Sequence, residues 1–132
     1  MPPKKEEIKV ELKPGLKYAG VDKPEPEVWE AGTDIEWTLK TNEGQDLRFK
    51  YLFIDGHQFS VNGSAKDGDT FKKVTVKPKT ITAKDKKKDE PEDFYYVIVI
   101  EETNNPEVTY IVMANTGGPH VITGGNPVIR NR

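Results

Sequence analysis

Apolar and polar residues alternate in several short segments, which is the pattern of β-strands with one buried face. The clearest example is Ile35, Trp37 and Leu39, which alternate with acidic, hydroxyl and basic residues. Apolar residues do not recur at the 3.6-residue period of an amphipathic helix over any usable window. The pattern therefore predicts an all-β chain, with its main strands at 8–12, 35–39, 47–54, 71–76, 80–83, 94–101 and 108–113.

Turn-forming dipeptides such as Pro14-Gly15 and Asp55-Gly56 separate these segments. We expect a disordered tail at residues 1–7 and a single domain at 8–132. About seven to nine short strands with regularly spaced turns indicate an antiparallel β-sandwich or a small barrel. We predict the sandwich, of the immunoglobulin-like type.

Residues 93–100 carry this immunoglobulin-like prediction. Tyr96, Ile98 and Ile100 alternate behind Asp93, a pattern that resembles the central F strand of immunoglobulin-like sandwiches. The resemblance implies that Trp37, on an early strand, is a core aromatic. The chain has no cysteine, so the inter-sheet disulfide of antibody domains is absent.

The second half of the chain, through Glu90-Pro91 and the terminal segment 126–131, resembles a small group of uncharacterised bacterial proteins. That group is named for Asp-Pro and Glu-Pro dipeptides. The last dipeptide here is Asn126-Pro127, where the group has Asp-Pro. The resemblance implies an immunoglobulin-like sandwich and no known activity.

Composition narrows the function classes. The 132 residues include 20 Lys and Arg, 22 Asp and Glu, and no Cys, for a net charge of −2. This excludes disulfide scaffolds, thiol nucleophiles and Cys-ligated metals. No run approaches the ~20 apolar residues of a membrane span, so we expect no membrane partner. Without a secretory signal at the start, we expect a cytoplasmic protein, with the mature part of an exported one as the alternative.

Basic runs at 72–73 and 86–88 invite a nucleic-acid function, but acidic residues interleave with them, so we expect no nucleic-acid partner. A stacking surface would need aromatics on a basic sheet face. Phe49, Tyr51 and Phe53 alternate with Arg48 and Lys50, which places the two sets on opposite faces. We therefore expect these three aromatics in the core.

The sequence contains no motif that is typical of a catalytic site. His57 and His120 lack metal-ligand spacing, and Asp67-Gly-Asp69 lacks the twelve-residue loop of an EF-hand. Nothing marks Ser60 or Ser64 as a nucleophile. We predict no catalytic residue, no metal and no cofactor. A hydrolase based on paired carboxylates is an open alternative, because the sequence cannot show a cleft.

One segment suggests an interface. Residues 94–100 are apolar on both faces, whereas a sandwich strand normally has one wet face. The second face consists of Tyr95, Val97 and Val99. Either a loop or the C-terminal segment covers this face, or a partner does. We predict a non-enzymatic module that acts by self-association or protein binding through these residues, with Trp29 nearby. The alternative is a carbohydrate-binding sandwich that uses Trp29 and Tyr18 as a stacking platform.

Overall fold

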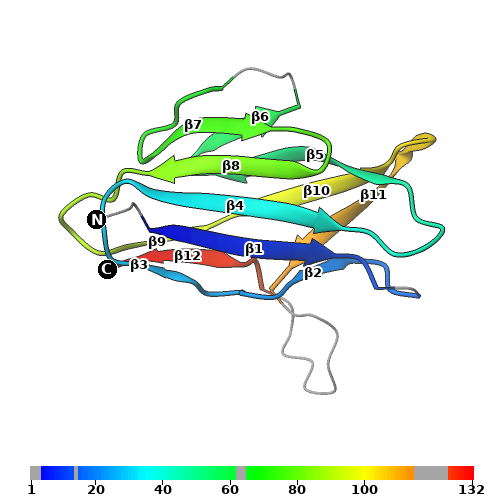
Figure 1. The fold of residues 1–132 in the computed structure, drawn as a ribbon, viewed down its shortest axis with the longest axis horizontal. Helices are drawn as coiled ribbons and strands as arrows, with labels where there is room; N and C mark the ends of the chain where they lie inside the picture. The colour runs from blue at the N-terminus through cyan, green and yellow to red at the C-terminus, as the bar shows by residue number, and fades with distance from the viewer. Residues whose placement is uncertain (1–3, 14, 62–64, 115–124) are drawn as a thin grey trace.

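The described part of the chain is built from β-strands. The computed structural model describes residues 4–13, 15–61, 65–114 and 125–132, which form twelve strands and no helix (Figure 1). The all-β prediction is confirmed. The strands are β1 (Lys5–Glu11), β2 (Ala19–Val21), β3 (Glu27–Val28), β4 (Thr33–Lys40), β5 (Leu47–Ile54), β6 (His57–Ser60), β7 (Phe71–Val76), β8 (Thr80–Asp85), β9 (Glu92–Tyr95), β10 (Val97–Glu102), β11 (Asn105–Met113) and β12 (Val128–Asn131).

The strands form two sheets. Nine of them follow the order β6-β5-β10-β11-β2-β1-β4-β8-β7, and a small sheet has the order β3-β12-β9. Figure 1 shows β5, β10 and β11 passing behind β8, β4 and β1, so the large sheet curls over on itself. Its ends approach where Phe49 N donates to Pro78 O (2.9 Å) and Thr70 N donates to Asp55 Oδ2 (2.5 Å). The large sheet is thus nearly closed, like a barrel.

The first strand begins earlier than the sequence suggests. β1 starts at Lys5, inside the segment 1–7 that we predicted as a disordered tail, and that part of the prediction is wrong. The cause is a parallel pairing of β1 with β4, in which Ile8 lies opposite Trp37. Lys5 Nζ also lies 3.4 Å from Glu36 Oε1. These contacts order residues whose own sequence is polar.

Aromatic side chains fill the core between the curled halves of the sheet. Trp37 and Tyr96 are fully buried and pack edge to face with their ring centroids 5.3 Å apart. Phe71 and Phe94 pack in the same way at 5.1 Å. The prediction of Trp37 as a core aromatic is confirmed, and edge-to-face pairs of this kind add to the energy of area burial.

A bulge in β5 reverses part of the predicted side-chain pattern. Val99 lies opposite Tyr51 and Ile100 opposite Phe49, which leaves Lys50 as an extra residue in β5. Phe49 is therefore buried, while Tyr51 is half-buried and Phe53 is 43% exposed. The prediction that Tyr51 and Phe53 belong to the core is wrong, because one added residue shifts the alternation.

The segment 94–100 is divided between the two sheets. β9 ends at Tyr95 and β10 begins at Val97, with the buried Tyr96 between them. Tyr96 N donates to Pro127 O at 3.0 Å, just before β12. Tyr95 therefore belongs to the small sheet, and Val97 belongs to the large one.

Candidate interaction surface

The outward side of β10 carries apolar side chains that continue onto both neighbouring strands. Val97 lies opposite Phe53 of β5, and Val99 lies between Tyr51 of β5 and Ile111 of β11. Side chains that are directly opposite across a sheet stand about 5 Å apart and touch. Two adjoining apolar rows result, one with Phe53 and Val97 and one with Tyr51, Val99 and Ile111.

Tyr95 extends these rows onto the small sheet. It lies opposite Val128 of β12 and two residues before Val97, so both side chains point outward. We call the six residues together the Val97 surface: Tyr51, Phe53, Tyr95, Val97, Val99 and Ile111.

Exposure is unevenly spread over the Val97 surface. Tyr95 is 57% exposed, Ile111 50% and Phe53 43%. Val97 is partly exposed, and Val99 is buried with 6% exposure beneath its neighbours. The Val97 surface thus has an apolar centre, Val97 and Val99, that is less exposed than the three large side chains around it.

Two of the three residues that the structure adds to the predicted set, Ile111 and Phe53, differ in how far the sequence indicates them. Ile111 lies in a segment that, like 94–100, is apolar on both faces, so the same test could have found it. The pattern of β5 places Phe53 in the core, and only the bulge at Lys50 turns it outward. No sequence signal marks that bulge.

Polar residues border the Val97 surface. Beyond Val99, the next outward row contains Arg48 and Glu101, whose Nε and Oε1 atoms lie 3.6 Å apart. Gln58 of β6 lies opposite Phe53, and Ser60 lies opposite Tyr51. An apolar centre with a polar rim is the usual anatomy of a protein–protein contact.

Trp29 is not part of this surface, although it is 59% exposed. It follows β3, across the small sheet from Tyr95, and the strand spacings place the two residues roughly 15 Å apart. Arg130 lies between them and bonds to Asp93 (2.6 Å) and Glu25 (3.0 Å). The hydrogen bond to Glu25 and the charge of Asp93 raise the pKa of Arg130. A row of charged side chains therefore separates Trp29 from Tyr95, Val97 and Val99, the residues that we predicted to share an interface with it.

The proposed stacking platform is not assembled either. Tyr18 precedes β2, and Trp29 follows β3, and these strands lie at opposite ends of one edge of the molecule (Figure 1). The structure does not place Tyr18 and Trp29 side by side.

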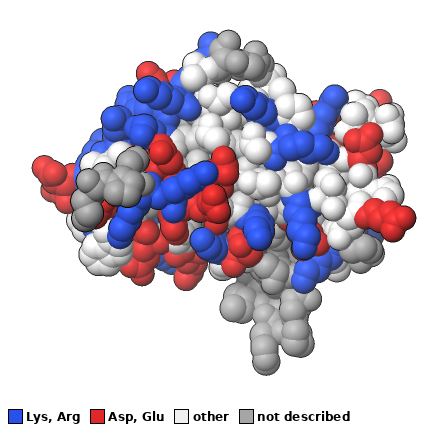
Figure 2. Space-filling view, in the orientation of Figure 1, with Lys and Arg blue, Asp and Glu red and all other residues white. Residues whose placement is uncertain are grey.

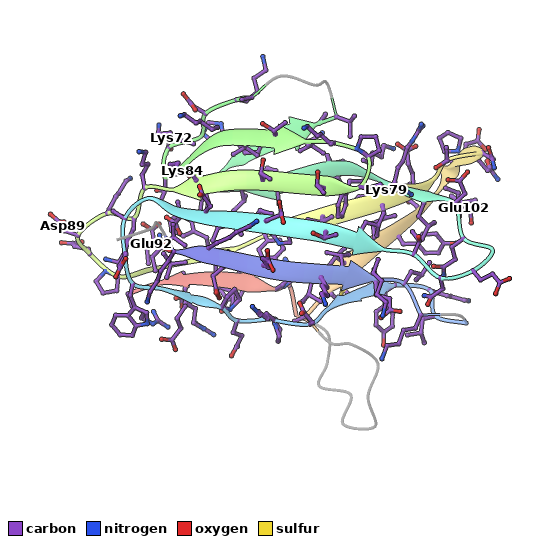
Figure 3. The ribbon with its side chains drawn as sticks, viewed as in Figure 1. Lys72, Lys79, Lys84, Asp89, Glu92 and Glu102 are labelled. Atoms are coloured by element: carbon purple, nitrogen blue, oxygen red, sulfur yellow. The ribbon has the colours of Figure 1, made fainter. Side chains whose placement is uncertain are left out.

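The opposite side of the molecule has a different character. Figure 2 shows Lys and Arg mixed with Asp and Glu over β1, β4 and β8. Lys84 Nζ lies 3.0 Å from Asp34 Oδ1, and Lys72 Nζ donates to Gly68 O at 2.6 Å. Lys72 and Lys84 are neighbours at one end of β7 and β8 (Figure 3). Paired charges of both signs keep this face hydrated.

In the described residues, no group of three or more His, Asp or Glu could hold a metal ion. His57 Nε2 lies 3.5 Å from Asp69 Oδ1 at an exposed position. Ser60 is exposed on β6. His120 and Ser64 lie outside the described residues. Among the described residues, no helix has the length and apolar content needed to cross a membrane.

No protein-family model matches the chain, and a search of curated proteins finds no match.

Proposed function

We propose that this protein is a non-enzymatic binding module that acts through protein–protein contact at the Val97 surface. The observation that carries the proposal is the joining of two apolar rows across β5, β10 and β11, with Phe53, Tyr95 and Ile111 each about half exposed. Contiguous apolar area of this kind, rimmed by polar residues, marks interaction sites on folded domains.

The exposed area of these side chains sets the free energy that a partner can gain by covering them. Three large side chains with about half of their area in water leave roughly 300 Å² of apolar surface uncovered, since a large aromatic has an area of about 150–250 Å². Covering apolar surface is worth about 25 cal/mol per Å². A partner that covers the Val97 surface gains several kcal/mol before the cost of association, and the hydrated face over β1, β4 and β8 offers no such gain.

The immunoglobulin-like sandwich is part of this proposal. Its support is the core pair of Trp37 and Tyr96 and the resemblance of residues 93–100 to an F strand. The resemblance to the bacterial group with Asp-Pro and Glu-Pro dipeptides also belongs here, as does a cytoplasmic location. The resemblance is supported by Glu90-Pro91 and the terminal segment 126–131.

The test uses the protein as bait against a cell extract. Wild type, Ile111→Arg and the control Thr82→Arg are immobilised at equal density, since Thr82 is exposed on β8, on the hydrated face. We expect a set of proteins that wild type and Thr82→Arg retain and that Ile111→Arg loses. Retention of the same set by all three baits would overturn the proposed function.

A further inference from the structure

We infer that the edge of β11 that faces away from β10 accepts an extended peptide segment of another protein as an added strand. β10 pairs with β11 from Asn105 to Ile111 on one side. On the other side, β2 pairs only with Val112 and Met113. Among the described residues, no strand pairs with residues 105–111 on that side. The proposed function concerns side chains of the Val97 surface, whereas this edge presents main-chain groups, so each can hold without the other.

The burial of β11 follows this pairing. Val112 is the one buried residue of the nine in β11, and it lies where the pairing with β2 begins. Thr109 and Ile111 are exposed, and Val108 and Tyr110 are half-buried. In Figure 1, β11 meets β2 at its end, and the turn between β10 and β11 lies far from β2. The edge of β11 before Val112 is therefore open in the described part of the chain.

Main-chain groups on this edge define the ligand. Successive residues of a strand direct their N–H and C=O groups to alternate sides, so about half of those in 105–111 point away from β10. These groups form no backbone hydrogen bond with another described segment. A row of unpaired donors and acceptors at strand spacing matches the backbone of another extended chain, which is how peptides add to the edges of sheets.

Three other edge strands carry a charge or a covering segment. Asp93 lies in β9, and Glu27 lies in β3. In β7, Val74 pairs with Lys66, which precedes the strand. Residues 108–111 of β11 are Val, Thr, Tyr and Ile, with no charge and no proline. Natural sheets protect their edges with charged residues, proline or a covering segment, and this stretch has none of these among the described residues.

The position of β2 favours a single segment over a second copy of this chain. The open stretch 105–111 ends where β2 begins to pair at Val112, and its length is roughly 23 Å. In a second copy, β2 lies on the same side of β11 that would have to face its partner, so it shortens the stretch that two copies can share. A lone extended segment has no strand attached and can pair along the whole stretch.

Side chains of β11 determine which segments fit. An added strand has Thr109 and Ile111 as neighbours on one face of the sheet, and Val108 and Tyr110 on the other. None of these four side chains has a charge to pair. We therefore expect segments with apolar or β-branched side chains beside Ile111 and Tyr110.

The probe for this edge is a library of random twelve-residue peptides displayed on phage and selected on the immobilised wild-type chain. We expect the strongest selected peptide to slow hydrogen exchange at alternate amides of 105–111. The amides of β9, another edge strand, are the control and should keep their exchange rates. Failure to select a peptide, or a selected peptide that leaves exchange at 105–111 unchanged, would overturn the inference.

Backbone methylation of the selected peptide separates strand pairing from side-chain binding. Methyl groups on the alternate amides that face β11 should weaken binding about tenfold or more, because each removes a main-chain hydrogen bond. Methyl groups on the intervening amides should leave the affinity nearly unchanged. Equal losses from the two sets would contradict strand addition. The proposed function would still stand if the bait experiment then showed proteins lost only with Ile111→Arg.

Discussion

Replacing Asp85 with Asn should stabilise the protein at neutral pH. Asp85 is the last residue of β8 and is fully buried. Its Oδ1 accepts hydrogen bonds from Asn131 Nδ2 (3.0 Å) and Lys87 N (2.9 Å). Its Oδ2 has no hydrogen-bond partner in the described structure, and neither does Asn131 Oδ1. In Asp85→Asn, the new amide nitrogen can donate to Asn131 Oδ1, which gives a partner to both atoms.

The pH dependence follows from the protonation of Asp85. Burial raises the pKa of Asp85 above 3.8, although the bonds from Lys87 and Asn131 oppose the rise. The folded state therefore holds this proton more tightly than the unfolded state, and stability is lost as the pH rises through the folded pKa. Asn carries no proton to lose. The gain from the substitution should be small below pH ~4 and should grow to a plateau above the folded pKa.

The magnitude follows from the buried atom that lacks a partner. Leaving such a group unsatisfied costs about 1–3 kcal/mol. For a chain of this length, that corresponds to roughly 4–10 °C in Tm at neutral pH. Urea unfolding of wild type and Asp85→Asn at several pH values measures the difference, with Asp89→Asn in the exposed loop as the matched control. A gain that is the same at every pH, or a loss at neutral pH, would refute the reasoning.

Four further substitutions test the fold by chemical unfolding. Tyr96→Phe removes a buried hydroxyl that has no hydrogen-bond partner in the described structure. We therefore expect the free energy of unfolding to stay the same or to rise by up to about 1 kcal/mol. A fall of more than about 1 kcal/mol would show that the hydroxyl has a partner. Phe49→Ala should cost about 3–5 kcal/mol because Phe49 is buried, whereas Phe53→Ala should cost less than about 1 kcal/mol; equal losses would show that the β5 bulge is misplaced. Gly56→Ala should cost about 1–2 kcal/mol because Gly56 has φ of +75° in the β5–β6 turn, and an unchanged stability would argue against that turn.

The strands were predictable because alternation is local. Residues 33–40 and the paired strands β10 and β11 lie close to where the pattern places them. The three parallel pairings, β1 with β4, β2 with β11 and β3 with β12, join segments that are distant in the chain. Nothing in a local pattern specifies such partners, which is why the start of β1 at Lys5 was missed.

The candidate surface was predictable only in part. Tyr95, Val97 and Val99 follow from an apolar run with two faces, but Val99 is buried by Tyr51 and Ile111 on the neighbouring strands. Whether Val99 is covered in this way depends on strand register, which decides the residues of the neighbouring strands that lie opposite it. Phe53 depends on a bulge, and a bulge is set by strand pairing and not by the residues around Lys50.

The burial of Asp85, a polar residue, could not be predicted from the sequence either. Its sequence neighbourhood is rich in lysine, which favours an exposed loop. In the structure, β8 extends to Asp85, and the small sheet covers its carboxylate through Asn131 of β12. Residues that are 46 positions apart create this buried pair.

The most direct test of the central claim is an amide chemical-shift map of the wild-type chain, recorded with and without the proteins that the bait experiment retains. We expect shifts to change at the Val97 surface, around Phe53, Val97 and Ile111, and to stay constant over β1, β4 and β8. Changes on that hydrated face, with none at the Val97 surface, would contradict the claim.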